Sequence, residues 1–266
     1  MPFICPVCGE NLIEGKQSFV CRRSHLFDKA KKGYVNLLLG HDGSQHGDSK
    51  PMALARYEVM QSGLYAPLKE ALLAAMRAHL QAPCVIADCG CGECYYTCAV
   101  SDTFAQAEVL ATDISKEALA VAKRRSPRFL RAVASSFNLP IASGSCDAAL
   151  NIFSPFAKEE YRRILKPGGL LFMVIPLEKH LLELKQAVYE SAYENTPKSS
   201  ALEGFSLPEE SVCDYRKTLS GAELSTLFAM TPYAIKTAPQ DVQKLESIDC
   251  LEVQFSFKIF VYQKQR

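Results

Sequence analysis

The chain has 266 residues, 48% of them hydrophobic, which is enough to bury a large core with a smaller unit beside it. The formal net charge of +1 excludes a protein whose whole surface attracts nucleic acid, so any such binding must use a local patch. The longest strongly apolar run covers residues 170–175, too short to cross a bilayer, and residues 1–10 do not have the pattern of a signal peptide. We therefore expect a cytoplasmic protein with no membrane partner.

The N-terminal segment carries a pattern typical of a metal site. Cys5 and Cys8 form a Cys-x-x-Cys knuckle, and Cys21 and His25 follow after a short polar segment. Three thiolates and an imidazole make the tetrahedral set that zinc prefers. A redox pair is the alternative for Cys5 and Cys8, but no strand and helix surround it. We expect one structural zinc ion to stabilise a zinc-binding domain over residues 1–36.

Basic and aromatic residues are interleaved around this knuckle. Such a surface can attract RNA phosphates and stack on bases, although a run of charges is equally often an ordinary solvated face. The sequence leaves both interpretations of this domain open, RNA recognition and solvation. The residues concerned are Lys16, Phe19, Arg22, Arg23, Phe27, Lys29, Lys31, Lys32 and Tyr34.

A second, larger domain is expected over residues 37–266. Its first part, residues 37–60, contains a stretch rich in Gly, Ser, Asp and Pro and is predicted to be a linker or loop. A helical pattern begins near Ala53 and leads towards Val85. Within this domain, a polar stretch over residues 195–210 is predicted to be an insertion.

The domain is organised around residues 85–97, VIADCGCGECYYT. A short apolar run ends at Asp88, breaks at Gly90 and Gly92, and continues through Glu93 into a segment compatible with a helix. This strand, glycine turn and helix are typical of a nucleotide-binding α/β domain. The turn is not a dinucleotide fingerprint, because Tyr95 stands at the third glycine position, and no phosphate-gripping Gly-Lys-Ser/Thr follows.

A second carboxylate limits the ligands that this turn can be expected to bind. Asp113 ends another apolar run, about 20 residues beyond the glycine turn, where an acid can accept hydrogen bonds from ribose hydroxyls. A loop containing Ser135 and Ser136 follows the next predicted strand and is placed to contact an adenine. A site that binds a ribose and lacks a phosphate-binding lysine is suited to S-adenosylmethionine (SAM), which carries a ribose but no phosphate.

Further segments alternate between strands and helices. Strands are predicted over residues 129–133, 147–153, 170–175 and 251–262, and a helix over 159–165. This order predicts an α/β fold with a mostly parallel sheet and helices on both faces. Asn151 and Ser154 lie at the end of one strand, where ligands bind in such folds, so they are candidates to contact the substrate in catalysis.

Taken together, these motifs resemble the bacterial 23S rRNA (guanine-N1)-methyltransferases. The resemblance covers nearly the whole chain and includes CPVC, CRRSHLFDKAKKGYVNLLL, GDS, DCGCGE-YYT, NIFSP, LKPGG and HLLELK. It implies a zinc domain ahead of a class I SAM-dependent methyltransferase domain with a Rossmann-like, seven-stranded sheet. It also implies a homodimer that methylates N1 of a guanine in a hairpin of 23S rRNA.

The resemblance assigns individual roles as well. Cys5, Cys8, Cys21 and His25 match the zinc ligands of the family. Gly92 and Glu93 match its SAM turn, and Tyr65 and His180 match positions that touch SAM. From the residues alone, His180 is as compatible with a capping or core histidine.

The chain departs from the family pattern at Cys94, where the family has glycine at the start of the helix. If that position requires a left-handed backbone, a side chain there strains the turn and weakens SAM binding. We therefore expect Cys94→Gly to tighten SAM binding.

Three other functions compete with this interpretation. Cys89, Cys91, Cys94 and Cys98 are spaced closely enough to hold an iron–sulfur cluster. The chain can also be a non-catalytic RNA-binding protein that retains SAM. Lastly, it can methylate another RNA or a small molecule, which the zinc domain and its basic surface disfavour.

Overall fold

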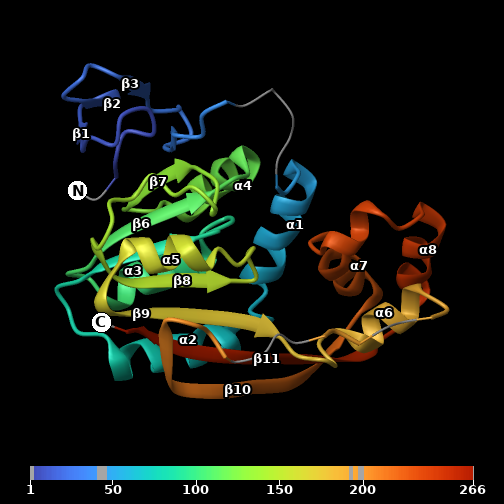
Figure 1. The fold of residues 1–266 in the computed structure, drawn as a ribbon. Coiled ribbons are helices and arrows are strands. Elements are labelled where there is room, and N and C mark those ends of the chain that lie inside the picture. Colours follow the sequence, from blue (N-terminus) through green and yellow to red (C-terminus); the bar gives the residue numbers. More distant parts are fainter. Residues whose placement is uncertain (1–2, 41–46, 192–193, 197–200, 266) are drawn as a thin grey trace.

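The computed structural model describes residues 3–40, 47–191, 194–196 and 201–265. A small N-terminal lobe lies at one edge of a long twisted sheet (Figure 1). A helical lobe formed by α6 (Leu182–Val188), α7 (Gly221–Ala229) and α8 (Pro239–Gln243) lies beyond the end of the strands. The parts of the predicted linker and insertion at residues 41–46 and 197–200 lie outside the described residues.

The N-terminal lobe is a three-stranded antiparallel sheet. Its strands are β1 (Leu12–Glu14), β2 (Ser18–Cys21) and β3 (Leu26–Asp28), in that order. The next strand, β4 (Val35–Asn36), leaves the lobe and pairs in parallel with the edge of the large sheet. Residues 35 and 36, at the end of the predicted zinc-binding domain, therefore join the lobe to the large sheet.

The large sheet has eight strands in the order β10-β11-β9-β8-β5-β6-β7-β4. The α/β fold class is confirmed, and β4 adds an edge strand to the seven that were expected. All pairs from β9 to β4 are parallel, whereas β11 runs antiparallel to both β9 and β10. The strands are β5 (Val85–Cys89), β6 (Glu108–Asp113), β7 (Leu130–Val133), β8 (Cys146–Ile152), β9 (Leu165–Pro176), β10 (Phe205–Leu219) and β11 (Leu251–Lys264).

The chain leaves β5 in one direction to form β6 and β7, and later returns on the other side to form β8 and β9. Such a reversal of strand order opens a crevice at the carboxyl ends of β5 and β8, which is where α/β sheets bind ligands. The fold therefore places the glycine turn after β5 next to the polar turn after β8.

Helices cover both faces of the sheet and form the helical lobe. No helix of the described chain is long and apolar enough to cross a membrane. The helices are α1 (Lys50–Gln61), α2 (Ala66–His79), α3 (Tyr95–Thr103), α4 (Lys116–Val121), η1 (Ala122–Arg125), α5 (Lys158–Ile164), α6 (Leu182–Val188), α7 (Gly221–Ala229), η2 (Pro232–Ile235), α8 (Pro239–Gln243) and η3 (Lys244–Ser247).

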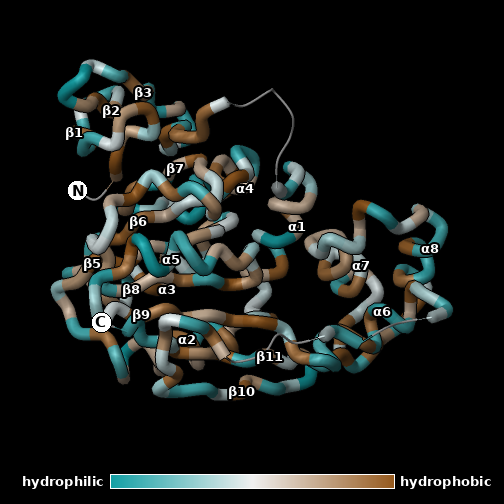
Figure 2. The backbone as a smooth tube through the Cα atoms, viewed as in Figure 1, coloured by the Kyte–Doolittle hydropathy of each residue, from teal (hydrophilic) through white to brown (hydrophobic). Residues whose placement is uncertain are grey.

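Alternation along the strands builds one core on each face. On β8 and β9, Leu150 and Phe172 point to the face covered by α2, while Ala149 and Leu171 point to the face covered by α5 and the N-terminal lobe. These central strands are buried on both sides and read as continuous apolar runs. Figure 2 shows the contrast with β10, much of which is hydrophilic at the sheet edge.

Two predicted boundaries are wrong for identifiable reasons. The linker expected over residues 37–60 ends at Ser49, whose hydroxyl accepts a hydrogen bond from the Met52 N–H and caps α1. The insertion expected over residues 195–210 ends before Phe205, because β10 begins there. The outward-facing residues of β10 are polar because an edge strand faces solvent, and this polarity resembles that of an insertion.

Candidate functional site

The four predicted zinc ligands come together in the N-terminal lobe. The Sγ atoms of Cys5 and Cys21 lie 3.5 and 3.4 Å from Nδ1 of His25, and the Sγ atoms of Cys8 and Cys21 lie 3.6 Å apart. All four ligand atoms lie within 4.8 Å of one another. A tetrahedral zinc site with ordinary Zn–S and Zn–N bonds has ligand–ligand edges of about 3.5–3.8 Å. The residues therefore fit one structural zinc ion.

The iron–sulfur alternative finds no support in the described part of the chain, where the four-ligand set above is the only group of three or more metal-binding side chains. Burial raises the pKa of the Cys89 and Cys91 thiols well above its usual value. Cys89 packs in a different apolar cluster from Cys91 and Cys94, so these sulfurs do not converge on one site.

The basic and aromatic residues of the lobe differ in their exposure to solvent. Lys16, Arg22 and Arg23 are exposed. In contrast, Phe19 is 2% exposed, and the Lys29 ammonium lies 5.0 Å from its ring centre. The surface therefore offers positive charge, whereas the Phe19 ring belongs to the lobe's core and cannot stack on a base.

The glycine turn after β5 is held by the acid after β6. The Asp113 carboxylate accepts hydrogen bonds from the Gly92 N–H at 2.8 Å and from the Ser115 N–H at 2.7 Å. A Cβ at Gly90 would lie 2.4 Å from the Cβ of Ser154, so the turn after β8 can approach only because this position is glycine. Asp113, predicted to bind a ribose, therefore also orders the turn beneath it.

Asp88, at the end of β5, is a buried carboxyl group in the same place. The Thr97 hydroxyl donates a 2.6 Å hydrogen bond to its Oδ2 atom. Burial raises the pKa of Asp88 to about 7, against the lowering effect of this hydrogen bond. A positive charge bound nearby would stabilise the carboxylate form.

Glu93 is held by an ion pair. Its carboxylate lies 2.9 Å from the Arg125 guanidinium, which also donates a hydrogen bond to the Glu93 carbonyl. Burial raises the pKa of Glu93, opposed by the charge of Arg125. The pair fixes the start of α3 against η1, so Arg125 has a structural role.

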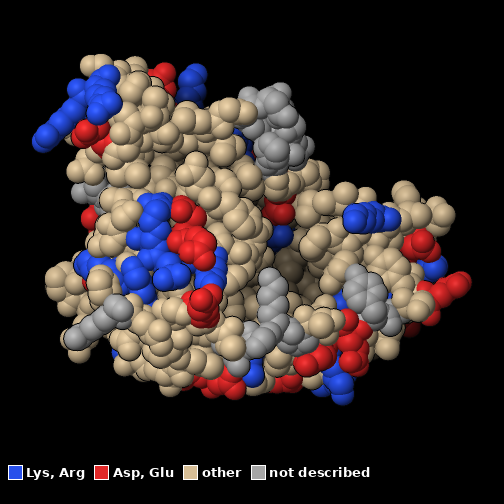
Figure 3. Space-filling model, in the orientation of Figure 1, with Lys and Arg blue, Asp and Glu red and all other residues tan. Residues whose placement is uncertain are grey.

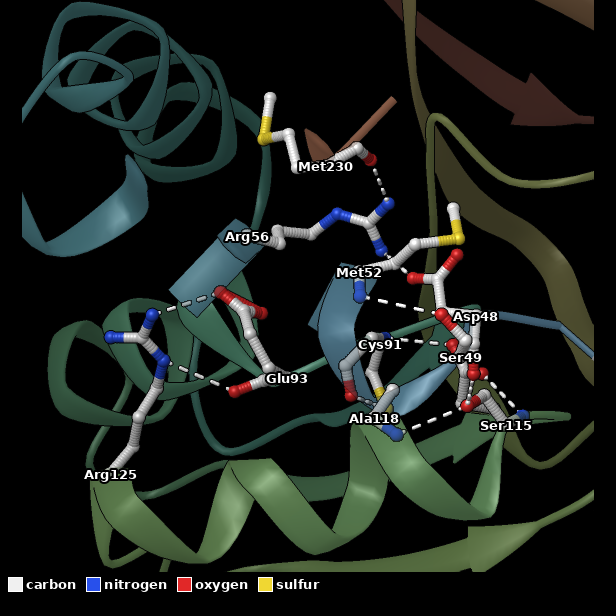
Figure 4. A network of polar contacts seen from close by, with 12 residues as sticks. Asp48, Ser49, Met52, Arg56, Cys91, Glu93, Ser115, Ala118, Arg125 and Met230 are labelled. Atoms are coloured by element: carbon white, nitrogen blue, oxygen red, sulfur yellow. Dashed lines mark hydrogen bonds and ion pairs between the residues drawn. The ribbon is translucent and has the colours of Figure 1, made fainter. Parts of the chain in front are cut away.

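A polar network that the sequence did not predict closes the site. The Arg56 guanidinium on α1 pairs with the Asp48 carboxylate and donates to the Met230 carbonyl at 3.0 Å. The Asp48 carbonyl accepts a 2.7 Å hydrogen bond from the Ser115 hydroxyl. Figure 4 shows Arg56 between Asp48 and Met230, with Glu93 and Arg125 beside it. Three segments distant in the sequence meet here, which no local pattern signals.

These elements surround one cleft of about 930 Å³. Figure 3 shows the surface hollowed between the body of the sheet and the helical lobe. Among the described residues that line the cleft, Arg56 is the only Lys or Arg, and the acidic ones are Asp48, Asp88, Glu93, Asp113 and Glu194. The cleft is therefore acidic, with a single cation.

All predicted ligand-contacting residues line this cleft, including Ser135 and Ser136 after β7. Tyr65 packs edge-on against Phe255, with ring centres 5.6 Å apart. The His180 ring lies 4.5 Å from that of Phe257, and burial lowers the pKa of His180 to about 3. His180 is therefore neutral, and the cleft wall around it is aromatic.

The two catalytic candidates shape the turn after β8. The Asn151 amide donates to the Ser154 hydroxyl at 2.6 Å and to the Tyr161 hydroxyl at 2.8 Å. The Ser154 hydroxyl donates to the Cys89 carbonyl at 2.8 Å. The structure thus brings Asn151 and Ser154 to the cleft, where their hydrogen bonds stabilise the turn that carries Phe153.

Cys94 has the left-handed backbone that the family's glycine would favour, with φ of +65° and ψ of +30°. Its side chain is fully buried beside Cys91, Ala111 and Leu119. The expectation that this position needs a positive φ is confirmed, and its effect on SAM binding stays a prediction.

Comparisons with known proteins match the N-terminal lobe and the large sheet to two different families of domain. A family model for the N-terminal zinc ribbon of RlmA matches residues 3–42, and a methyltransferase-domain model matches residues 87–173. A 23S rRNA (guanine(748)-N1)-methyltransferase from Streptomyces fradiae is 40% identical over 69% of this chain and 66% of that relative. A Micromonospora griseorubida protein, provisionally named a 23S rRNA (guanine-N1-)-methyltransferase, is 34% identical over 88% of this chain and 87% of its own length.

Solved structures of distant proteins share the fold. The YcgJ protein of Bacillus subtilis has a TM-score of 0.51 and 15% identity, with 74% of this chain and 99% of that chain covered. The [4+2]-cyclase SpnF has a TM-score of 0.50 and 15% identity, with 74% and 80% covered. The cyclase shows that this fold alone does not define the reaction.

Proposed function

Because the chain belongs to the 23S rRNA (guanine-N1)-methyltransferase family, we propose that it transfers a methyl group from SAM to N1 of a guanine in a hairpin of 23S rRNA. The observation that carries the proposal is the combination, in one chain, of a complete zinc-ligand set and an acidic cleft around a glycine turn. We take the residues of the cleft named above as its SAM-binding residues.

The charges of the cleft match those of SAM. The ligand carries two positive charges, on its ammonium and sulfonium groups, and one negative carboxylate. Acidic side chains attract the two cations. Arg56 offers the one guanidinium for the carboxylate, and it lies at the glycine turn, 3.8 Å from where a Gly92 Cβ would be.

Bound SAM would supply a methyl group from its sulfonium, and the sulfur would then remain as a neutral thioether. The chain's own residues then have to orient the guanine and exclude water. Loss of the N1 proton to water frees the electron pair that forms the new N–C bond while the S–C bond breaks, so the base must leave its Watson–Crick pair first. The turn after β8, fixed by Asn151 and Ser154, lies against the glycine turn and is proposed to position that base.

The zinc lobe is proposed to guide the RNA. Its exposed cations include Arg22, Arg23, Lys31 and Lys32, and Figure 3 shows blue side chains gathered on it. Phosphate attraction of this kind orients an RNA without reading its sequence. The family resemblance also implies a homodimer, which light scattering in solution tests, and a cytoplasmic location remains our expectation.

The test uses purified protein, radiolabelled methyl-SAM and 23S rRNA transcribed without modifications. We expect one methyl group per rRNA and a primer-extension stop at a single guanine, because N1-methylguanine cannot pair. SAM binding without methyl transfer would contradict the proposal and favour the non-catalytic, SAM-retaining alternative. Transfer to another RNA with no stop in 23S rRNA would favour a different substrate.

A further inference from the structure

Two aromatic side chains of the described chain are exposed, and both line the cleft. Phe137 is 64% exposed and Phe153 is 43% exposed, whereas the other described aromatic rings are buried or half-buried. Single exposed apolar side chains are common on protein surfaces, so exposure alone does not assign a role to either ring.

Phe153 differs from Phe137 in its backbone. Its φ is +54°, a left-handed conformation that non-glycine residues rarely adopt. Such a conformation costs of the order of 1–3 kcal/mol and persists only where its surroundings enforce it. Phe137 is not among the residues with positive φ and lies in a turn closed by the Ser135 hydroxyl.

The surroundings of Phe153 do enforce its position. Asn151 holds Ser154, and Ser154 holds the Cys89 carbonyl at the end of β5, across the space left open by Gly90. The glycine turn and the turn after β8 are thereby locked together, and Phe153 is the residue presented at the tip of the second turn.

One part of the Phe153 ring is supported from within the cleft. Its centre lies 5.5 Å from the Phe257 ring and 6.4 Å from the Tyr65 ring, which it meets edge-on. The rest of the ring faces solvent. A ring held by two aromatic neighbours while its residue stays 43% exposed can stack on a planar ligand.

The reaction needs such a platform. A guanine extruded from an RNA hairpin loses its stacking neighbours, and proteins replace them with aromatic side chains. A cleft of about 930 Å³ is near the upper end of small-molecule sites, so it has room for a base in addition to SAM.

Resting on the proposed function, we propose that the exposed face of the Phe153 ring stacks on the target guanine and holds it beside the methyl donor. Asn151 and Ser154 are then positioning residues, which act through the turn that presents the ring. The inference assigns Phe153 to the substrate and not to SAM.

The first test separates the two ligands. Phe153→Leu keeps an apolar side chain without a π face, and Phe153→Tyr keeps the ring. At saturating SAM, we expect Phe153→Leu to lower kcat/KM for unmodified 23S rRNA at least about tenfold, since stacking on an aromatic ring contributes this much or more per base. We expect Phe153→Tyr to stay within about twofold of wild type, and both variants to keep the wild-type Kd for SAM. Wild-type kcat/KM in Phe153→Leu would overturn the proposal.

The second test reads the stack directly. The chain has no tryptophan, so Phe153→Trp introduces a single indole, which can be excited apart from the 11 tyrosines. With S-adenosylhomocysteine present, rRNA should quench it, and an rRNA with an abasic site at the methylated guanine should not. Phe137→Trp is the matched control, and its signal should not depend on that base. Equal quenching by both RNAs in Phe153→Trp would overturn the proposal. Absence of methylation by the wild type would instead contradict the proposed function.

Discussion

The N-terminal lobe and the large sheet are stabilised by different interactions. The lobe's strands have three or four residues each, and its few buried apolar side chains, such as Leu12 and Phe19, surround the zinc ligands. The sheet buries continuous apolar strands on two faces. A unit of the lobe's size cannot stabilise itself by apolar burial alone, so its order depends on the metal, whereas the sheet does not need one.

The two regions nevertheless share a core where they meet. Phe3 pairs with Ile141 and is fully buried, and Leu37 hydrogen-bonds to Val133 at the edge of the sheet. The base of the lobe is thus part of the sheet's core, and its tip is held by zinc. The two regions thus separate two tasks: the surface proposed to guide RNA lies on a metal-dependent unit, and the cleft lies on a sheet stabilised by its own apolar core.

Removing the metal should have the largest effect, because it should unfold the lobe and leave the sheet folded. In Cys21→Ser, we expect loss of bound zinc and fast amide exchange in residues 10–30, because zinc contributes an apparent 10–16 kcal/mol, in rough terms, to such sites. Methylation of rRNA should be lost, while the Kd for SAM stays near wild type. Hydrogen exchange, zinc analysis and calorimetry measure these effects.

Cys250→Ser is the matched control, since Cys250 is an exposed free thiol outside the zinc site. It should keep zinc, exchange protection and methylation. A Cys21→Ser protein whose residues 10–30 remain protected would show that the lobe does not depend on its metal.

The pH dependence of SAM binding tests the buried carboxyl group of the sheet. The pKa of Asp88 lies at about 7, raised by burial, so its carboxyl is mostly protonated below that pH. A cationic ligand favours the carboxylate, so the affinity for SAM should rise between pH 6 and 8 and level off above, by about tenfold at most. Asp88→Asn should remove this rise, because an amide does not titrate. The site should keep its shape, because the Thr97 hydroxyl can still donate to the amide oxygen. A pH profile unchanged in Asp88→Asn would assign the titration to Glu93 or Asp113.

The sequence predicted what short-range patterns determine. The four zinc ligands, the glycine turn and the acid after β6 follow from residue types at fixed spacings, and the structure brings each set together. The network of Asp48, Arg56 and Met230 could not be predicted, because it joins residues up to 174 positions apart. Likewise, the backbone conformation of Phe153 depends on contacts with β5 that no pattern around it encodes.

Cys94→Gly tests a smaller effect in the glycine turn. Glycine removes the cost of a left-handed backbone, about 1–2 kcal/mol, but it also removes a buried sulfur from the packing around α3. We expect a net tightening of SAM binding of about twofold to fivefold, measured by calorimetry. Cys94→Ala is the control, because it loses the sulfur and keeps the strained backbone, so it should bind SAM no better than wild type. Weaker binding in Cys94→Gly would mean that packing outweighs strain at this position.

We expect the smallest effect from a surface ion pair of the N-terminal lobe. Lys29 pairs with Glu14 across the β-strands of the lobe, with about a third of the Glu14 side chain exposed (34%). Such pairs contribute about 0.2–1 kcal/mol, and Lys29 keeps its hydrogen bond to the Gly15 carbonyl when Glu14→Gln removes the charge. We therefore expect the free energy of lobe opening, measured by amide exchange with zinc bound, to fall by less than about 1 kcal/mol. A larger loss would mean that surface charges share the role assigned to zinc, and the contrast between the two regions would then be one of degree.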